Sequence, residues 1–184
     1  MSVKKVKSKE QILWNNINAR SNPDSAECKR FPKYLGTENW FDSFEEFSSW
    51  CNMSEGFGLL DDKGNSYALD KDLAILAGDT DCKAYGEHCV FLPAKLNSVV
   101  KLVYGNKKQL PGVTPYIGDR YRMQYRDIDG NKHHGGIYET EQDAHKSWKK
   151  MQSVVFNDAS EYALHLGLIK AARMFKQAAT RFKG

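Results

Sequence analysis

Residues 120–138, RYRMQYRDIDGNKHHGGIY, decide the fold of the C-terminal half of this chain. The first seven of these residues alternate between long polar side chains and apolar or aromatic ones, which is the period of a β-strand with two different faces. Asp129-Gly130 is a strong hairpin-turn signal, so the residues that follow it return as a second strand. A further strand that opens at Val113 completes the pattern, which predicts three antiparallel strands.

The two faces of this predicted sheet differ in chemistry. One face is expected to pack on a helix through Tyr121, Met123, Tyr125 and Ile137. The other face carries side chains that donate hydrogen bonds, namely Arg120, Arg122, Gln124, Arg126, Lys132 and His134. Arg can form paired hydrogen bonds with guanine and Gln with adenine, and a twisted sheet can lie in the major groove. The polar face therefore predicts a DNA-binding surface, with an ordinary solvated sheet face as the alternative.

Two helices are expected after the sheet. Thr140 is expected to cap the first, and a second is expected over residues 160–180. The first helix carries apolar side chains at helical spacing, at Ala144, Trp148, Met151 and Val155.

The sequence of the N-terminal half predicts short helices and strands separated by turns. A helix is expected over residues 11–20, and a second over 43–51, where Ser43 and Glu46 form a capping-box pattern. Further along, YALDKDLAIL (67–76) is predicted as a strand-like run, CVFLP (89–93) as a strand and AKLNSVVKLV (94–103) as a helix. The fold class expected is therefore α+β.

The charge is distributed unevenly along the chain. Residues 1–100 carry 12 Lys/Arg and 15 Asp/Glu, whereas residues 101–184 carry 15 Lys/Arg and 8 Asp/Glu. A basic half is the electrostatic pattern expected for a protein with a polyanionic partner, although a solvated basic surface gives the same composition.

The sequence also bears on where in the cell the protein is expected and on the state of its cysteines. The N-terminus lacks the apolar segment of a signal peptide, and no stretch approaches 18 apolar residues, so a cytoplasmic protein without a membrane partner is expected. The four cysteines form no CxxC pair. Cys82, His88 and Cys89 leave a structural zinc site open, but buried free thiols are the favoured interpretation.

The C-terminal half resembles the Apetala/ethylene-response-type DNA-binding domain over residues 112–157. The resemblance rests on the Gly-Val start, the order and spacing of three strands, the glycines of the third strand and the Thr-Glu start of the helix. It implies that Gln124, Arg126, Lys132 and His134 fall at positions that contact DNA in this family. The first strand departs from the family, because Thr114 and Tyr116 stand where arginines are usual.

The middle of the chain resembles phage-encoded HNH-like homing endonucleases that carry such a domain. The shared features, in order, are the aromatic-rich segment 40–50, LDKD (69–72), CVFLP (89–93) and the Asn of the next helix, Asn97. The resemblance implies a small ββα-metal-like (HNH-like) nuclease domain with N-terminal helices over residues 1–104. Residues 105–184 would then form the DNA-binding sheet with its helices. It also implies a metal-dependent endonuclease acting on double-stranded DNA in the cytoplasm of an infected bacterial host.

The chemistry of such a site assigns roles to particular residues. Phosphodiester cleavage needs a divalent ion and a base that activates water. Asp70 and Asn97 match the two ligand positions and present hard oxygens suited to one Mg²⁺ or Mn²⁺, with no small-molecule cofactor. Lys71 stands where the family has its histidine, so Lys71 and His88 are both candidates for the base. The alternative is that LDKD is a solvent-facing, ion-paired strand and Asn97 a surface or capping residue.

Three classes of function remain open at this point. The first is a homing-type endonuclease that cuts or nicks a specific site. The second is a sequence-preferring DNA-binding regulator whose HNH-like core has lost catalysis, since the usual histidine is absent. The third is a protein-interaction module with an incidental basic face. DNA binding that depends on salt separates the first two from the third, and metal-dependent cleavage separates the first from the second.

Overall fold

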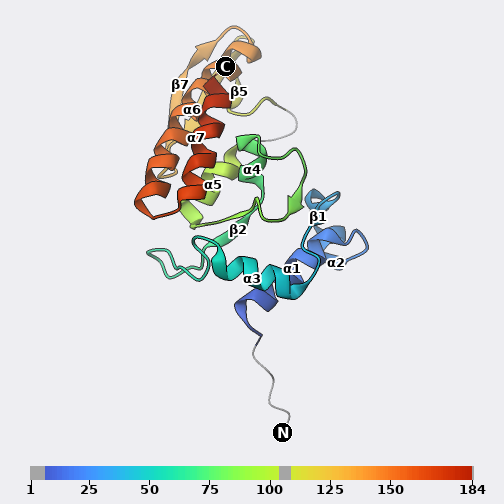
Figure 1. Ribbon diagram of the computed structural model, residues 1–184. Coiled ribbons are helices and arrows are strands. Elements are labelled where there is room, and N and C mark those ends of the chain that lie inside the picture. Colours follow the sequence, from blue (N-terminus) through green and yellow to red (C-terminus); the bar gives the residue numbers. More distant parts are fainter. Residues whose placement is uncertain (1–6, 104–108, 184) are drawn as a thin grey trace.

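The computed structural model describes residues 7–103 and 109–183 and shows a mixed helical and sheet protein, half of it helical. The expected α+β class is therefore confirmed at this level. Figure 1 shows a three-stranded sheet and two long helices at one end of the molecule, short helices at the other, and small strands between them. Within the described ranges, no helix is both long enough and apolar enough to cross a membrane.

Short elements make up the first third of the chain. They are α1 (Lys9–Ser21), α2 (Ala26–Arg30), η1 (Pro32–Tyr34), β1 (Glu38–Asn39) and α3 (Phe44–Met53). The start of α3 agrees with its expected cap, because Ser43 Oγ accepts a hydrogen bond from the Glu46 N–H at 3.1 Å. The side chains of Phe47, Trp50 and Cys51 on this helix are buried.

The middle of the chain forms two antiparallel strands followed by a helix. Its elements are β2 (Ala68–Asp70), α4 (Asp72–Ala77), β3 (Ala84–Tyr85), β4 (Val90–Leu92) and α5 (Ala94–Leu102). Strand β2 pairs antiparallel with β4, with Asp70 opposite Val90, and β1 pairs with β3 in parallel. Helix α5 packs against both β2 and β4.

The prediction of one strand-like run over residues 67–76 is wrong after Asp70. The chain turns there into α4, because Asp70 Oδ1 accepts hydrogen bonds from the N–H groups of Asp72 and Leu73. The apolar residues that follow are buried, and α4 packs closely against α7. A short apolar run suits a buried strand and a buried helix equally, so the tertiary partner decides the outcome.

The C-terminal half contains the expected three-stranded sheet. Strands β5 (Val113–Tyr116), β6 (Arg120–Arg126) and β7 (Lys132–Tyr138) pair antiparallel in the order β5-β6-β7. The inner face packs on α6 (Glu141–His165) through a small core of Val113, Met123, Ala144 and Trp148. Gly112 precedes β5 with a φ of +76°, and a Cβ there would lie 1.9 Å from Trp148 Cδ1, so α6 can approach the chain this closely only at a glycine.

One residue of this sheet lies on the opposite face from the prediction. Met123 pairs with Gly136 but Gln124 pairs with His134, so Gly135 is an extra residue in β7 and the register shifts. Ile137 consequently pairs with Arg122 and is 46% exposed on the polar face, instead of packing on the helix. Tyr138 packs on the inner side in its place.

Helices α6 and α7 (Ile169–Lys183) form an antiparallel pair that joins the two halves of the chain (Figure 1). α6 extends to His165, beyond the start expected for the second helix. The larger hydrophobic core combines residues of the first half, such as Phe47 and Phe91, with Phe156 of α6 and Phe175 of α7. The expected domain boundary between residues 104 and 105 lies outside the described residues.

Candidate metal site and nucleic-acid interface

Asp70 is a buried carboxylate at the end of β2, with 6% of its surface exposed. Its Oδ1 accepts hydrogen bonds from the N–H of Asp72 at 3.0 Å and of Leu73 at 2.8 Å, and these bonds cap the start of α4. The second carboxylate oxygen, Oδ2, takes no part in this cap. Burial raises the pKa of Asp70 from 3.8 to about 6, against the backbone hydrogen bonds that lower it. The solvent-facing alternative is therefore wrong for Asp70. Its charged carboxylate is poorly solvated, and a bound cation would compensate for the missing solvation.

Asn97 lies on α5, which packs across the same two strands. It is 8% exposed, so the surface alternative for this residue is also wrong. Its side-chain Oδ1 is buried and has no hydrogen-bond partner among the described residues. A buried amide oxygen without a partner is costly to a folded protein, which makes it a natural ligand position for a cation or a bound water.

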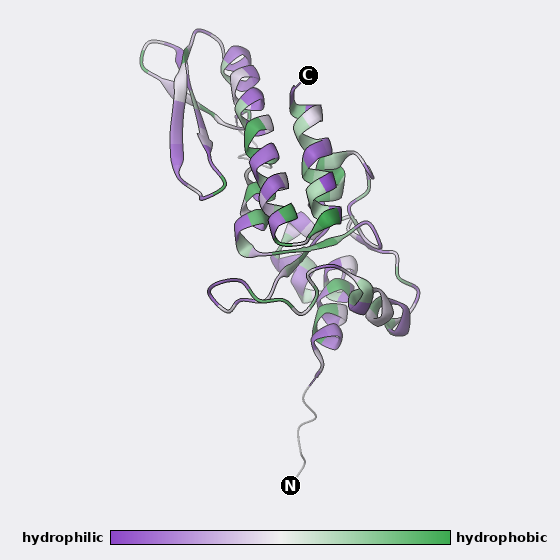
Figure 2. Cartoon of the chain, turned by 60° about the vertical axis from the view of Figure 1, so that its left-hand side comes forward, coloured by the Kyte–Doolittle hydropathy of each residue, from purple (hydrophilic) through white to green (hydrophobic). Residues whose placement is uncertain are grey.

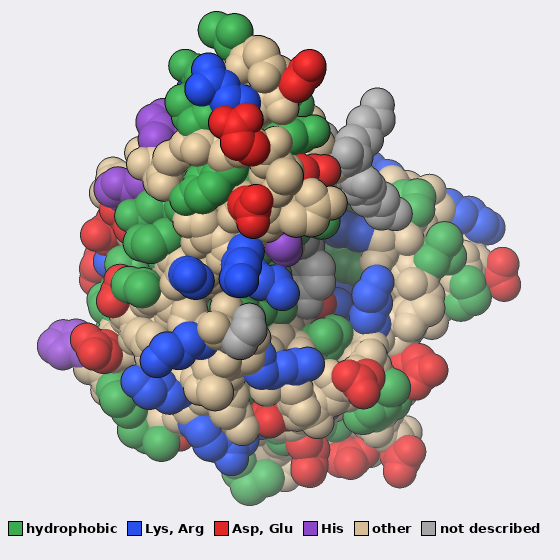
Figure 3. Space-filling model, turned by 90° about the horizontal axis from the view of Figure 1, so that it is seen from above, with side chains coloured by type: hydrophobic (Ala, Val, Ile, Leu, Met, Phe, Trp, Pro, Cys, Tyr) green, Lys and Arg blue, Asp and Glu red, His purple; other side chains and the backbone are tan. Residues whose placement is uncertain are grey.

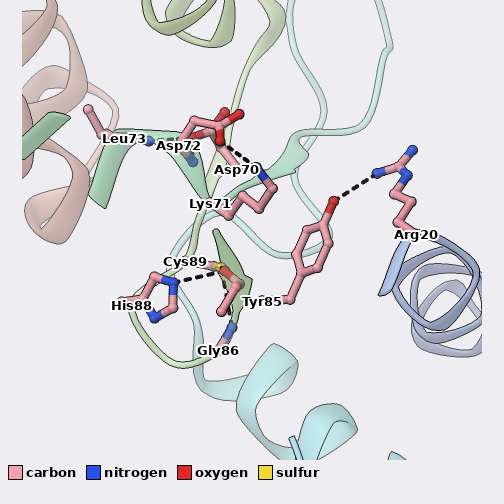
Figure 4. Close-up of polar contacts among 10 residues, drawn as sticks. Arg20, Asp70, Lys71, Asp72, Leu73, Tyr85, Gly86, His88 and Cys89 are labelled. Carbon is pink, nitrogen blue, oxygen red and sulfur yellow. Dashed lines mark hydrogen bonds and ion pairs between the residues drawn. The ribbon is translucent and has the colours of Figure 1, made fainter. Parts of the chain in front are cut away.

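Lys71 follows Asp70 and is 9% exposed. Its ammonium group forms an ion pair with Asp72. Figure 4 shows Asp70, Lys71 and Asp72 together at the end of β2, close to the segment that leads into β4. An ammonium group held by a carboxylate is better suited to contacting a phosphate than to accepting a proton.

His88 is half-buried on the approach to β4. Its Nε2 lies 2.9 Å from the carbonyl oxygen of Ala84 (Figure 4), and its ring meets Trp40 edge-on. Because a carbonyl can only accept, Nε2 carries the proton and Nδ1 presents a lone pair. Burial lowers the pKa of His88, and the charges of Lys170 and Lys71 act in the same direction. This neutral imidazole is in the state that a general base requires.

Lys170 is a residue at this site that the sequence did not reveal. Its ammonium donates to the carbonyl oxygens of Glu87 and, at 3.2 Å, of Cys89, the two residues that flank His88. Its backbone N–H donates to Glu55 at 2.9 Å, which fixes the start of α7. Lys170 thus ties the last helix to the segment that carries His88, across more than eighty residues of sequence.

The zinc alternative receives no support from the cysteines. Cys89 is buried, and burial raises its pKa to about 12, whereas Cys82 is exposed. In the part of the chain that the structure describes, no group of three or more His, Cys, Asp and Glu side chains is arranged to hold a metal ion.

The outer face of the sheet presents the expected polar side chains. Figure 2 shows the strands as largely hydrophilic beside helices that alternate between hydrophilic and hydrophobic residues. Arg122 and Arg120 lie over the ring of Tyr116, at 5.4 and 6.0 Å from its centroid. Arg122 Nε is buried without a hydrogen-bond partner among the described residues. Stacked, partly unsatisfied guanidinium groups are well prepared to bind bases or phosphates.

The remaining predicted DNA contacts share this face, although some are engaged within the protein. Gln124 Nε2 donates to Thr114 Oγ1 at 2.5 Å, and Arg126 donates to the Gly130 carbonyl at 2.7 Å. Lys132 and His134 are exposed on β7, opposite Arg126 and Gln124 respectively. The sheet therefore brings together all six side chains that the sequence assigned to DNA contact.

Positive charge is not confined to the sheet. Figure 3, the view from above, shows Lys and Arg side chains gathered across the middle of that end of the molecule. Helix α7 carries five basic side chains and no acidic one. Some of them have structural partners, since Arg181 donates to the Ile75 carbonyl at 3.0 Å and Arg173 pairs with Asp79. The positive charge of residues 101–184 thus comes from both the sheet and α7.

Comparisons with protein-family models, with curated proteins and with solved structures gave no significant match to this chain.

Proposed function

We propose that this protein is a metal-dependent, homing-type DNA endonuclease with an HNH-like, ββα-metal-like core. Two buried side-chain oxygens carry the proposal: Asp70 at the end of β2, with its raised pKa, and Asn97 on α5, the helix that packs on β2 and β4, with an Oδ1 that has no hydrogen-bond partner among the described residues. Asp70 also caps the start of α4, but a buried charge and a buried oxygen without a partner both cost stability.

These two residues fit a hard divalent cation. Carboxylate and amide oxygens suit Mg²⁺ or Mn²⁺, and Mg²⁺ keeps several waters, so a site with few protein ligands is ordinary for it. When bound, the ion supplies charge neutralisation at the phosphate and assistance to the leaving oxygen.

The chain's own residues would divide the remaining tasks. His88, held neutral with a lone pair at Nδ1, accepts the proton of the attacking water. Lys71, held by Asp72, contacts a phosphate oxygen. Lys170 keeps His88 in place by holding the two carbonyl groups beside it. The arrangement favours His88 over Lys71 as the base.

The sheet would hold the duplex while the site acts on it. Gln124 and Arg126 are proposed to read bases, whereas Arg120 and Lys132 mainly contact phosphates. The exposed arginines of β6 and the exposed Lys132 and His134 of β7 support this assignment.

The test is incubation of the full chain with phage genomic DNA and Mg²⁺ or Mn²⁺, followed by mapping of the new DNA ends. The proposal expects cleavage that stops in EDTA and in Asp70→Ala, while DNA binding persists in that variant. Asp62→Ala is the matched control, because Asp62 is an exposed carboxylate in the same part of the chain. Equal cutting by the two variants would exclude Asp70 as a ligand.

A second candidate is a DNA-binding regulator that no longer cuts. It is favoured by Lys71, which occupies the position of the family's histidine and is engaged by Asp72. If the unmutated chain binds its native target but never cuts it with any divalent ion, this function replaces the endonuclease.

A further inference from the structure

An isoleucine lies on the polar face of the sheet, near the end of the edge strand β7. The extra residue Gly135 turns Ile137 outward, where it pairs with Arg122 and is 46% exposed. A side chain at Gly135 would overlap Met123, with a Cβ only 1.9 Å from its terminal carbon, so the shifted register depends on that glycine. The outward position of Ile137 is therefore built into the strand.

The neighbours of Ile137 define a row across the three strands. Thr114 of β5 and Ile137 of β7 are both paired with Arg122 of β6. Arg122 has a guanidinium over Tyr116 and an Nε without a partner among the described residues. An arginine and an exposed aliphatic side chain thus stand next to each other on a surface that is otherwise polar.

A duplex offers few apolar groups to such a surface. In the major groove the distinctive one is the 5-methyl group of thymine, and aliphatic side chains are its usual contact. Guanine offers two acceptors in the same groove, which an arginine can bind together. Adjacent strands lie about 4.8 Å apart and neighbouring bases about 3.4 Å apart, and the long arginine side chain can span the difference.

We infer that Ile137 is a specificity-determining residue that contacts the methyl group of a thymine next to a guanine bound by Arg122. This inference rests on the proposed function, in particular on DNA binding by the sheet. It names the feature of the DNA target that the sheet would recognise, a thymine methyl group next to a guanine. It also explains why an isoleucine occupies an exposed position next to Arg122.

The experiment removes single methyl groups from the DNA. The full chain first selects duplexes from a random library at low salt. Each thymine of the selected duplex is then replaced by uracil, which differs only by the methyl group, and the Kd is measured by fluorescence anisotropy. For the wild type, replacement at one thymine next to a guanine should weaken binding roughly fourfold, the effect of burying one methyl-sized group.

The variant Ile137→Ala should bind the thymine and uracil duplexes equally. Ile12→Ala is the matched control, because Ile12 is 50% exposed on α1, outside the sheet, and this variant should keep the wild-type discrimination. Salt-dependent binding with no effect of any uracil, or unchanged discrimination in Ile137→Ala, would overturn the inference and leave the proposed DNA binding intact. Absence of duplex binding by the wild type would overturn both.

Discussion

Replacement of Asp70 by Asn should stabilise the metal-free protein while it removes the carboxylate charge from the proposed metal site. Asn keeps an oxygen that can accept from the N–H groups of Asp72 and Leu73, so the start of α4 is preserved. It removes the buried charge whose pKa is raised from 3.8 to about 6. That difference corresponds to about 3 kcal/mol at pH values above 6, as an upper estimate, at 1.36 kcal/mol per pKa unit.

The dependence on pH has a definite sign. Between pH 4 and 6, approximately, the folded wild type keeps a proton on Asp70 that the unfolded chain has released, so this residue makes stability fall as the pH rises. The Asn variant lacks that effect, and its advantage should grow from none near pH 4 to its full value above pH 6. Other groups, such as His88, titrate in both proteins and cancel in the comparison.

The assay is thermal unfolding by circular dichroism in EDTA at several pH values. For a chain of this length, about 3 kcal/mol corresponds to a Tm increase of about 6–12 °C. Addition of Mg²⁺ should raise the Tm of the wild type but not that of Asp70→Asn. Asp62→Asn should match the wild type throughout. A variant that is less stable than the wild type at pH 8 without metal would refute the assignment of Asp70 as a destabilising buried charge.

The remaining predictions concern DNA binding and the base. Arg122→Ala combined with Arg126→Ala should weaken duplex binding at low salt and flatten the slope of log affinity against log salt; unchanged binding would exclude the sheet as the DNA surface. Arg126→Ala alone should relax preference at one or two base positions, by about 1–3 kcal/mol, whereas Lys132→Ala should weaken all sequences alike, as measured by competition between duplexes. His88→Ala should slow cleavage by roughly 10²–10⁴-fold with binding preserved, and a loss of that size in Lys71→Ala instead would make the lysine the base.

The sheet could be predicted because its information is local. Residues 120–126 alternate with the period of a strand, and Asp129-Gly130 marks the turn, so strand order and inner face follow from the sequence alone. Ile137 could not be placed, because its face depends on the extra residue Gly135 and on the contact of that glycine with Met123 across the sheet. A single bulge reverses the faces of every residue beyond it.

The candidate metal site could be predicted only as a pair of residue types in a plausible order. The burial of Asp70 and Asn97 comes from packing of α4, α5 and α7, which no local pattern specifies. For the same reason α4 was expected as a strand. Lys170 could not be identified at all, because its role depends on the approach of the last helix to the segment before β4.

The most direct test of the proposed metal site is whether Asp70 and Asn97 together bind one divalent ion. Titration of the full chain with Mn²⁺, followed by electron paramagnetic resonance of the free ion, measures this without relying on a known DNA target. We expect one bound Mn²⁺ per wild-type chain and none in Asp70→Asn or Asn97→Leu, with Asp62→Asn unchanged. Binding by both site variants at the wild-type level, or no bound Mn²⁺ in the wild type with or without DNA, would contradict it.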